Sequence, residues 1–159
     1  MFEIRLAEPE NAEEIMSLYR SLVGTKGLTW SEDYPLLDDV ERDIAEKSLY
    51  IAVSDGEIIA AAGAGVDEEV AELSEIENVC SLYRVGVRRD FQRKGTAGKL
   101  LEYIKKDVEK RGFCGMFFLV AKGNEPALKL YEKHGFKRKG EAFMFGFDFW
   151  CYEINFKEK

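Results

Sequence analysis

The sequence predicts a mixed α+β fold with one central sheet of six to seven strands and about four helices. The first observation is the order of periodic segments: strand, two helices, two strands, strand, helix, strand, helix and two strands. The second is the strand, helix and strand in the middle of the chain, which are typical of a crossover within a sheet. The third is the pair Asp55-Gly56 between two apolar runs, the strongest short signal for a β-hairpin.

The N-terminal third is expected to contain one strand and two helices. Phe2–Leu6 alternates apolar and polar residues, which is typical of a half-buried strand. Between Asn11 and Val23 the apolar residues recur at helical spacing, with Asn11 as the N-cap and glutamates in the first turn. Glycines end this helix, and Asp38–Glu46 is expected to form a short second helix.

The rest of the chain is expected to contain six strands and two helices. The acidic connection that precedes the central strand has too little periodicity for an assignment. The expected elements are, in order, an antiparallel hairpin of Leu49–Ser54 and Glu57–Gly65, the central strand Val79–Val87, a helix from Lys99 to about Arg111, a buried strand Met116–Ala121, a helix from Pro126 to about His134 followed by Gly135, and two strands, Phe136–Phe145 and Phe147–Phe156, about a turn near Gly146.

Composition limits the class of protein. The 159 residues, 46% of them hydrophobic, suit a single domain over residues 1–159 with a substantial core. The sequence has neither an apolar run long enough to span a bilayer nor a secretory leader pattern, so we expect a cytoplasmic protein without a membrane partner. The three cysteines lie far apart and there is one histidine, so we expect neither a disulfide framework nor a metal site.

The charges are unevenly distributed along the chain. The net charge of -7 argues against nucleic acid as a partner. Arg84–Arg111 nevertheless contains ten Lys or Arg and four acidic residues, whereas Asp67–Asn78 contains six acidic residues and no basic one. The first segment suits a polyanion and the second a cation, although each is also typical of a solvated surface.

A glycine-containing turn between the central strand and the next helix is the main candidate site. Its residues are Gln92, Arg93, Lys94, Gly95, Thr96, Ala97 and Gly98. Glycines allow a close approach of the backbone, and the helix that follows directs unpaired amides and its positive dipole end toward the turn. These features predict a phosphate cradle, although such turns also occur as plain connections between elements.

A second motif follows about thirty residues later and consists of Asn124-Glu125-Pro126-Ala127-Leu128-Lys129-Leu130-Tyr131, with Gly135-Phe136 after it. In this order and at this spacing, the chain resembles the GNAT superfamily of acyl-CoA-dependent N-acyltransferases. The pyrophosphate motif of that family is (Gln/Arg)-x-x-Gly-x-(Gly/Ala), and its second motif is Asn-x-x-Ala-x-x-Leu-Tyr followed by Gly-Phe. Both are matched position for position, and the resemblance extends from about Arg5 to Phe156.

This resemblance implies a GNAT-like fold, whose mostly antiparallel sheet splays at the cofactor cleft beside the central strand. It also implies acetyl-CoA as cosubstrate, without a metal. The residues from Gln92 to Gly98 would bind the diphosphate through backbone amides, with added charge from Arg93 and Lys94. The amides of Val85, Gly86 and Val87 would bind the acyl carbonyl and the pantetheine arm, which Asn124 would also contact. Gly86 is alternatively a glycine kink in a strand.

The resemblance assigns the proton donor to a matching residue but not the general base. Tyr131 matches the usual proton donor to the coenzyme A thiolate, although a helix tyrosine that packs under the sheet is the alternative. Tyr83 occupies the strand position where many relatives have a Glu that acts as the general base. Glu77 or Glu75 is therefore the candidate base, directly or through water, unless both are merely solvated.

Two interpretations follow for function. The first is an N-acetyltransferase that transfers an acetyl group from acetyl-CoA to a primary amine by direct attack in a ternary complex. The acceptor, a small molecule or a protein, is expected to be cationic and to contact Trp30, Tyr34, Tyr83 and Glu75, although Trp30 and Tyr34 also suit simple packing. The second interpretation is a non-catalytic acyl-CoA sensor on the same fold. A homodimer is compatible with both.

Overall fold

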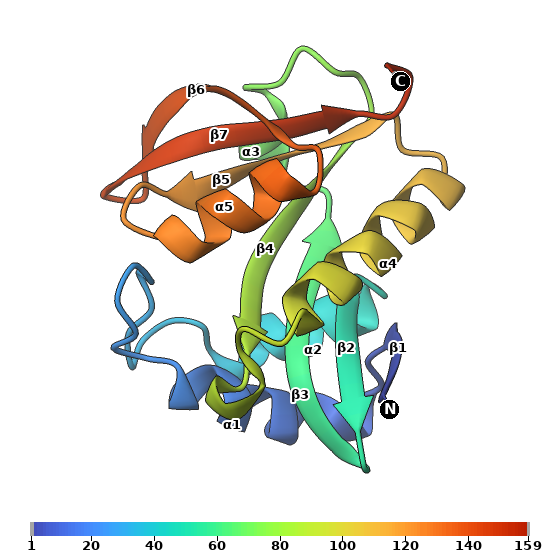
Figure 1. The fold of residues 1–159 in the computed structure, drawn as a ribbon, viewed down its shortest axis with the longest axis vertical. Helices are drawn as coiled ribbons and strands as arrows, with labels where there is room; N and C mark the ends of the chain where they lie inside the picture. Colours follow the sequence, from blue (N-terminus) through green and yellow to red (C-terminus); the bar gives the residue numbers. More distant parts are fainter. Residues whose placement is uncertain (1, 159) are drawn as a thin grey trace. The chain divides into compact units, whose positions relative to one another are not determined.

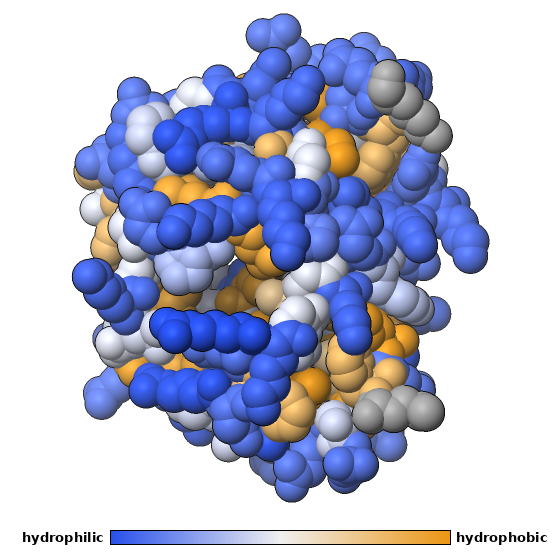
Figure 2. Space-filling model, in the orientation of Figure 1, coloured by the Kyte–Doolittle hydropathy of each residue, from blue (hydrophilic) through white to orange (hydrophobic). Residues whose placement is uncertain are grey.

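The computed structural model describes residues 2–158. Among these residues, seven strands in the order β1-β2-β3-β4-β5-β7-β6 and five α-helices form a mixed α/β structure. This confirms the predicted fold class and the upper value of the predicted strand number. Within this described part of the chain, no helix combines the length and the apolar character that crossing a membrane requires. On the face shown in Figure 2, hydrophilic residues predominate and apolar residues form separate patches.

The chain divides into two compact units. The first unit contains Met1–Thr25, Trp30–Ala64 and Arg84–Ile104, and the second contains Lys26–Thr29, Gly65–Tyr83 and Lys105–Lys159. The strand β4 (Val79–Val87) and the helix α4 (Thr96–Lys110) each contribute residues to both units. The single domain predicted for residues 1–159 therefore stays a prediction, as does the splay of the sheet.

The first unit is built on the predicted hairpin. Its elements are β1 (Phe2–Leu6), the 3-10 helix η1 (Pro9–Asn11), α1 (Ala12–Ser21), α2 (Leu37–Ala45), β2 (Leu49–Ser54), β3 (Glu57–Gly65), the end of β4, the 3-10 helix η2 (Arg89–Phe91) and the start of α4. β2 pairs antiparallel with both β1 and β3. The helices α1 and α2 cover one face of these strands, and the first turns of α4 cover the other (Figure 1). Fully buried side chains such as Ile15, Ile51 and Ile59 form its core.

The second unit contains the remaining strands. Its elements are α3 (Glu68–Ala71), the start of β4, the end of α4, β5 (Gly115–Ala121), α5 (Glu125–Lys133), β6 (Lys137–Met144) and β7 (Phe147–Asn155). β7 pairs antiparallel with β5 and β6, whereas β4 pairs in parallel with β5 at Val79–Gly115 and Cys80–Met116. Figure 1 shows α5 on one face of these strands and α3 on the other.

Most element boundaries agree with the sequence prediction. The hairpin and the central strand have the predicted bounds, and Gly135, with a φ of 91°, follows α5 as its C-terminal glycine. One boundary was wrong, and one cap has the predicted position but a different bond. α4 begins at Thr96 rather than Lys99, because a buried Thr96 already takes part in the first turn. Asn11 occupies the N-cap position of α1, but its side chain accepts from the Glu8 amide (2.8 Å) instead of capping the helix.

Gly115 begins β5 at a point where no side chain fits. A Cβ at this position would lie 2.4 Å from the Ile154 carbonyl oxygen and 3.2 Å from Ile76 Cδ1. Because overpacking of this kind typically costs about 1–3 kcal/mol, we expect Gly115→Ala to lower the free energy of unfolding by about 2 kcal/mol. Urea denaturation measures this free energy of unfolding. Gly123→Ala is the control, since the nearest atom would be 3.9 Å away; equal unfolding midpoints for the two variants would contradict the expectation.

Candidate functional site

The predicted phosphate turn leads from η2 into α4. Two of its residues, Arg93 (φ 64°) and Gly95 (φ 83°), have left-handed backbone conformations, which turn the chain sharply before the helix. Gly95 is exposed, and apart from its neighbours in the chain no residue lies within 4 Å of where its Cβ would be. The Thr96 hydroxyl donates to the Phe91 carbonyl oxygen (3.3 Å), which fixes the start of the helix. The turn therefore presents an open glycine beside the unpaired amides of a helix N-terminus.

Charge at this turn comes from the two basic residues that the sequence singled out. Arg93 and Lys94 are both exposed, and the Lys94 ammonium lies 5.4 Å from the centre of the Phe91 ring. The predicted site residues Gln92 and Val87 lie together, because the Gln92 side-chain amide donates to the Val87 carbonyl oxygen (2.9 Å). This bond ties the turn to the end of β4. The turn and the strand end are therefore connected by a side-chain hydrogen bond as well as by the chain.

The end of β4 is covered by aromatic residues. A Cβ on Gly86 would lie 2.8 Å from Leu22 Cδ1, 3.4 Å from the Trp30 ring and 3.5 Å from the Tyr19 ring. Tyr19 and Trp30 pack edge to face, with ring centroids 5.1 Å apart. Glycine at position 86 thus lets these side chains approach the strand backbone closely. The structure brings the predicted residues Gly86 and Trp30 together. It adds Tyr19 from α1 and Leu22, which follows α1, and the sequence had indicated no site role for either.

A buried ion pair lies beside the same strand and was not predicted. Arg84 donates to the Asp43 carboxylate from Nη2 (2.5 Å) and Nε (3.2 Å), and the two side chains are 10% and 3% exposed. Burial raises the pKa of the Asp43 carboxyl group, an effect that the Arg84 guanidinium opposes. Arg84 also donates to the Tyr34 hydroxyl (2.8 Å). Tyr34, a predicted acceptor residue, is therefore held by a strand residue fifty positions away.

In the second unit, Asn124 lies at the start of α5. Its side chain accepts from the Ala127 amide (3.4 Å), so it serves as the N-cap of that helix. Gly27 approaches this turn so closely that a Cβ there would lie 2.8 Å from the Gly123 carbonyl oxygen and 2.9 Å from Asn124 Cα. Asn124 thus has a structural role as a helix cap. Its contact with the pantetheine arm stays a prediction.

Tyr131 lies on the buried face of α5. Its ring packs edge-on against Phe118 (4.9 Å between centroids) and lies 6.0 Å from Phe136 and 6.2 Å from Tyr152. Burial raises the pKa of the Tyr131 hydroxyl well above its ordinary value. Tyr131 therefore stays protonated over the ordinary pH range and keeps a proton to donate. Its packing against these rings fixes its position, and its catalytic role stays a prediction.

The other predicted residues of the second unit are exposed or half-buried. Glu75 and Glu77 are exposed in the connection between α3 and β4, and Tyr83 is half-buried in β4. The six acidic residues of this segment include Asp67, which caps α3 through the Val70 amide (3.3 Å). An exposed carboxylate suits attraction of a cation as well as proton transfer, so the identity of the base stays a prediction.

Comparison with known proteins settles the family. The model of the acetyltransferase (GNAT) family matches residues 14–136, which is more than half of the chain. The chain belongs to this family. Its glycine turn and the start of α5 both lie inside the matched region of the GNAT model.

Curated relatives of this GNAT chain match over a shorter stretch. The [Ribosomal protein bS18]-alanine N-acetyltransferases of Escherichia coli (strain K12) and Salmonella typhimurium are each 38% identical over 56 residues. That stretch is 35% of this chain and 38% of each relative, so the chain spans little more than a third of their length. These matches support the family assignment.

Solved structures of GNAT proteins share the fold over nearly the whole chain. A GNAT-family acetyltransferase from Streptococcus agalactiae has a TM-score of 0.82 at 24% identity, with 99% of this chain and 96% of the other covered. The protein yncA from Salmonella typhimurium, a putative acetyltransferase solved with acetyl-CoA, has a TM-score of 0.79 at 17% identity, with 100% and 96% covered. At these identities the likeness establishes the GNAT fold.

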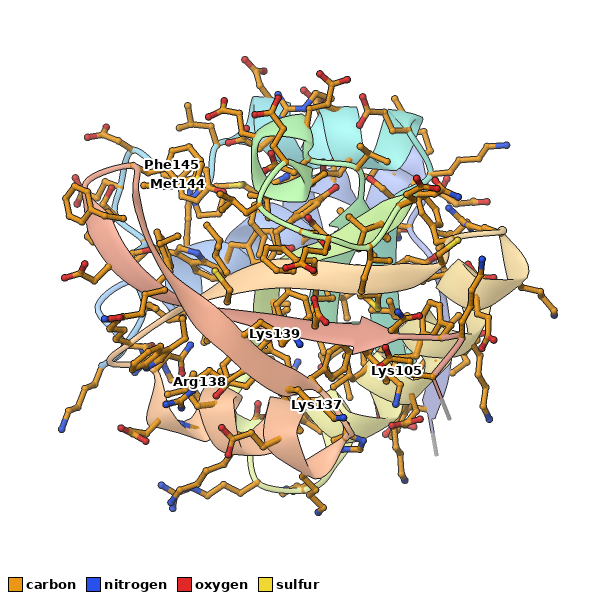
Figure 3. The ribbon with its side chains drawn as sticks, turned by 90° about the horizontal axis from the view of Figure 1, so that it is seen from above. Lys105, Lys137, Arg138, Lys139, Met144 and Phe145 are labelled. Atoms are coloured by element: carbon orange, nitrogen blue, oxygen red, sulfur yellow. The ribbon has the colours of Figure 1, made fainter. Side chains whose placement is uncertain are left out.

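One surface feature of this GNAT chain was not predicted. Figure 3 shows Lys137, Arg138 and Lys139 toward one end of β6, with Met144 and Phe145 at the other. The exposed hairpin tip carries Phe143, Phe145 and Phe147, which are 70%, 64% and 45% exposed. Phe145 itself has a φ of 56° and Gly146 a φ of 84°, so the two residues form a tight turn of the primed type. Exposed aromatic residues in such number often mark a contact surface.

Proposed function

We propose that this protein is an N-acetyltransferase that transfers an acetyl group from acetyl-CoA to a primary amine. The observation that carries the proposal is the open turn at Gly95, which lies at the N-terminus of α4 and inside the region matched by the GNAT family model. Its left-handed backbone and unpaired amides suit a diphosphate. The curated relatives are named as N-acetyltransferases of a protein alanine, which supports an amine as the acceptor class.

The cofactor residues have complementary tasks in this proposal. The amides of residues 92–98 bind the diphosphate, and exposed Arg93 and Lys94 add attraction for its charge. The amides of Val85, Gly86 and Val87 bind the pantetheine arm and the thioester carbonyl, where negative charge develops during attack. Acetyl-CoA supplies the activated acyl group. Asn124 contacts the pantetheine arm.

The acceptor must reach the thioester as a neutral amine. In our proposal Glu77 or Glu75 removes its proton, directly or through water, and attracts a cationic acceptor. Trp30, Tyr34 and Tyr83 contact the acceptor. The amine then attacks the carbonyl carbon, and its nitrogen, which becomes positively charged, loses a second proton to solvent water. The bond from carbon to sulfur breaks, and Tyr131 donates a hydrogen bond to the departing thiolate, which becomes proton transfer as charge develops.

A non-catalytic acyl-CoA sensor is the second candidate. It is favoured by Tyr83, which occupies the position where many relatives have a glutamate that acts as the general base. A thiol-release screen distinguishes the two functions. Acetyl-CoA is offered with polyamines, aminoglycosides, amino acids and peptides, among them peptides that begin with alanine. We expect acceptor-dependent release of thiol for at least one class. Binding of acetyl-CoA without any acceptor-dependent release supports the sensor.

Neutralising the two exposed glutamates tests the role of the acidic segment. We expect Glu75→Gln with Glu77→Gln to raise the KM of a cationic acceptor, and added salt to have the same effect on the wild type, because both weaken long-range attraction. Steady-state kinetics measure the KM. Glu109→Gln with Glu158→Gln, also exposed, is the control with the same change in net charge. A change confined to acetyl-CoA affinity would refute the role.

A further inference from the structure

Arg84 interrupts β4 with an unusual backbone conformation. Its φ of 49° is left-handed, in a strand whose residues otherwise favour extended geometry. Glycine adopts such an angle freely, whereas a long side chain such as arginine does so at a cost that contacts elsewhere in the fold must offset. A left-handed residue also rotates the peptide that follows it, as in a β-bulge. The peptide in question carries the amide of Val85.

The stabilising contacts come from the Arg84 side chain. Its guanidinium is nearly enclosed and bonds the Asp43 carboxylate of α2 through two nitrogens, at 2.5 and 3.2 Å. A buried charge without its partner is strongly unfavourable, so this pair confines the side chain to one position. A change of φ at residue 84 redirects its Cβ and so disturbs these bonds. The ion pair therefore opposes relaxation of the strand to regular geometry.

The same guanidinium reaches the loop before α2. Its Nη1 donates to the Tyr34 hydroxyl at 2.8 Å. The loop is itself held together by the Ser31 amide, which donates to the Tyr34 carbonyl oxygen (2.9 Å), and by the reciprocal bond from Tyr34 to Ser31 (3.3 Å). Tyr34 is 40% exposed, so part of the residue remains accessible. One planar cation thus contacts both the loop and the strand.

We propose that Arg84 is a positioning residue that uses its ion pair with Asp43 to hold the amides of Val85 and Gly86 and its bond to Tyr34 to hold the acceptor loop. This inference rests on the proposed function, in which those amides stabilise the charge that develops on the thioester oxygen. A lysine could not replace Arg84, because its single ammonium cannot bond Asp43 through two nitrogens and Tyr34 through a third. Arg84 sets geometry without contacting the reacting atoms.

The test first replaces the ion pair by apolar residues. A second variant then places glycine at position 84, so that the left-handed backbone conformation is again available without the ion pair. Asp43→Leu with Arg84→Met removes both charges together, which avoids leaving one buried and unpaired. We expect kcat to fall about 100-fold, as for loss of one oxyanion donor. Asp43→Leu with Arg84→Gly should recover at least about tenfold of this loss, because glycine adopts the left-handed angle freely. Equal kcat for the Met and Gly pairs, or a Met pair with wild-type kcat, would overturn the proposal.

Further variants separate the two contacts. Tyr34→Phe should shift the amide NMR signal of Ser31, which bonds the Tyr34 carbonyl oxygen, and should raise the acceptor KM several-fold. An unshifted Ser31 signal would remove the loop from the proposal, because loss of a direct contact with the acceptor raises KM without moving the loop. Arg42→Met, which breaks an exposed ion pair with Asp39 on the same helix, is the control and should change neither the signal nor the KM. If the Met pair fails to fold, Arg84→Lys replaces it, with the same expected loss of kcat.

A readout without turnover keeps the inference apart from the proposed function. The amide NMR signals of Val85 and Gly86 should shift in the Met pair and return toward wild-type positions in the Gly pair. If wild-type protein acetylates no amine, the proposed function fails, and these signals alone decide the inference. Unshifted signals in the folded Met pair would overturn it.

Discussion

Replacing Tyr131 with phenylalanine should lower kcat by about 10²- to 10⁴-fold and leave folding and acetyl-CoA affinity intact. The substitution removes one hydroxyl and keeps the ring, which packs against Phe118 and Phe136. Because burial raises the pKa of this hydroxyl, the wild type keeps its proton as the pH rises through the ordinary range. Deprotonation of Tyr131 should therefore cause no loss of kcat as the pH rises through that range. Steady-state kinetics with the acceptor found by the thiol-release screen measure both effects.

A change of leaving group shows whether the hydroxyl assists departure. The loss of kcat should shrink with an acyl donor whose thiol is more acidic, because such a thiolate leaves with less help from a proton. Tyr103→Phe is the matched control, since Tyr103 is 41% exposed and its ring contacts Tyr50 (6.1 Å). Full turnover of the Tyr131 variant on acetyl-CoA would make Tyr131 a packing residue only.

Replacing Gly95 with valine should weaken acetyl-CoA binding at least about tenfold, equivalent to about 1.4 kcal/mol. Gly95 has a φ of 83°, and a Cβ at this position would meet no residue within 4 Å other than its neighbours in the chain. A β-branched residue there strains the backbone and occupies the space through which a phosphate would approach the amides. Isothermal titration calorimetry with acetyl-CoA measures the change.

The chain offers a control with the same backbone strain. Gly112 follows α4, has a φ of 100° and is equally free of neighbours within 4 Å. Gly112→Val should therefore cost similar stability and leave acetyl-CoA affinity unchanged. Unchanged affinity in the Gly95 variant, or equal losses in both variants, would contradict the phosphate assignment.

Local signals account for the parts of the fold that the sequence predicted. Asp55-Gly56 fixed the hairpin of β2 and β3, because this pair adopts the turn that such a hairpin requires. Pro126 and Gly135 marked both ends of α5, since proline has a φ preset for the first helical turn and glycine adopts the left-handed φ that ends many helices. The two motifs led to the family because their spacing is specific.

What the sequence did not reveal depends on tertiary contacts. Asp43 and Arg84 are 41 residues apart, and each looks like an ordinary surface charge until the fold buries both. The four residues of α3 were missed because they are too few for a helical period to emerge. The close approach of Trp30 to Gly86 likewise depends on how the loop before α2 folds.

Transfer of a labelled acetyl group tests the central claim most directly. Protein, acetyl-CoA with a carbon-13 acetyl group and the acceptor identified by thiol release are incubated together, and all components are analysed by mass spectrometry. We predict the label on the acceptor nitrogen, one free thiol for each labelled amine, and none on the protein, as direct attack in a ternary complex requires. A label retained on the protein would contradict direct attack, and bound acetyl-CoA with no labelled amine would contradict the enzyme itself.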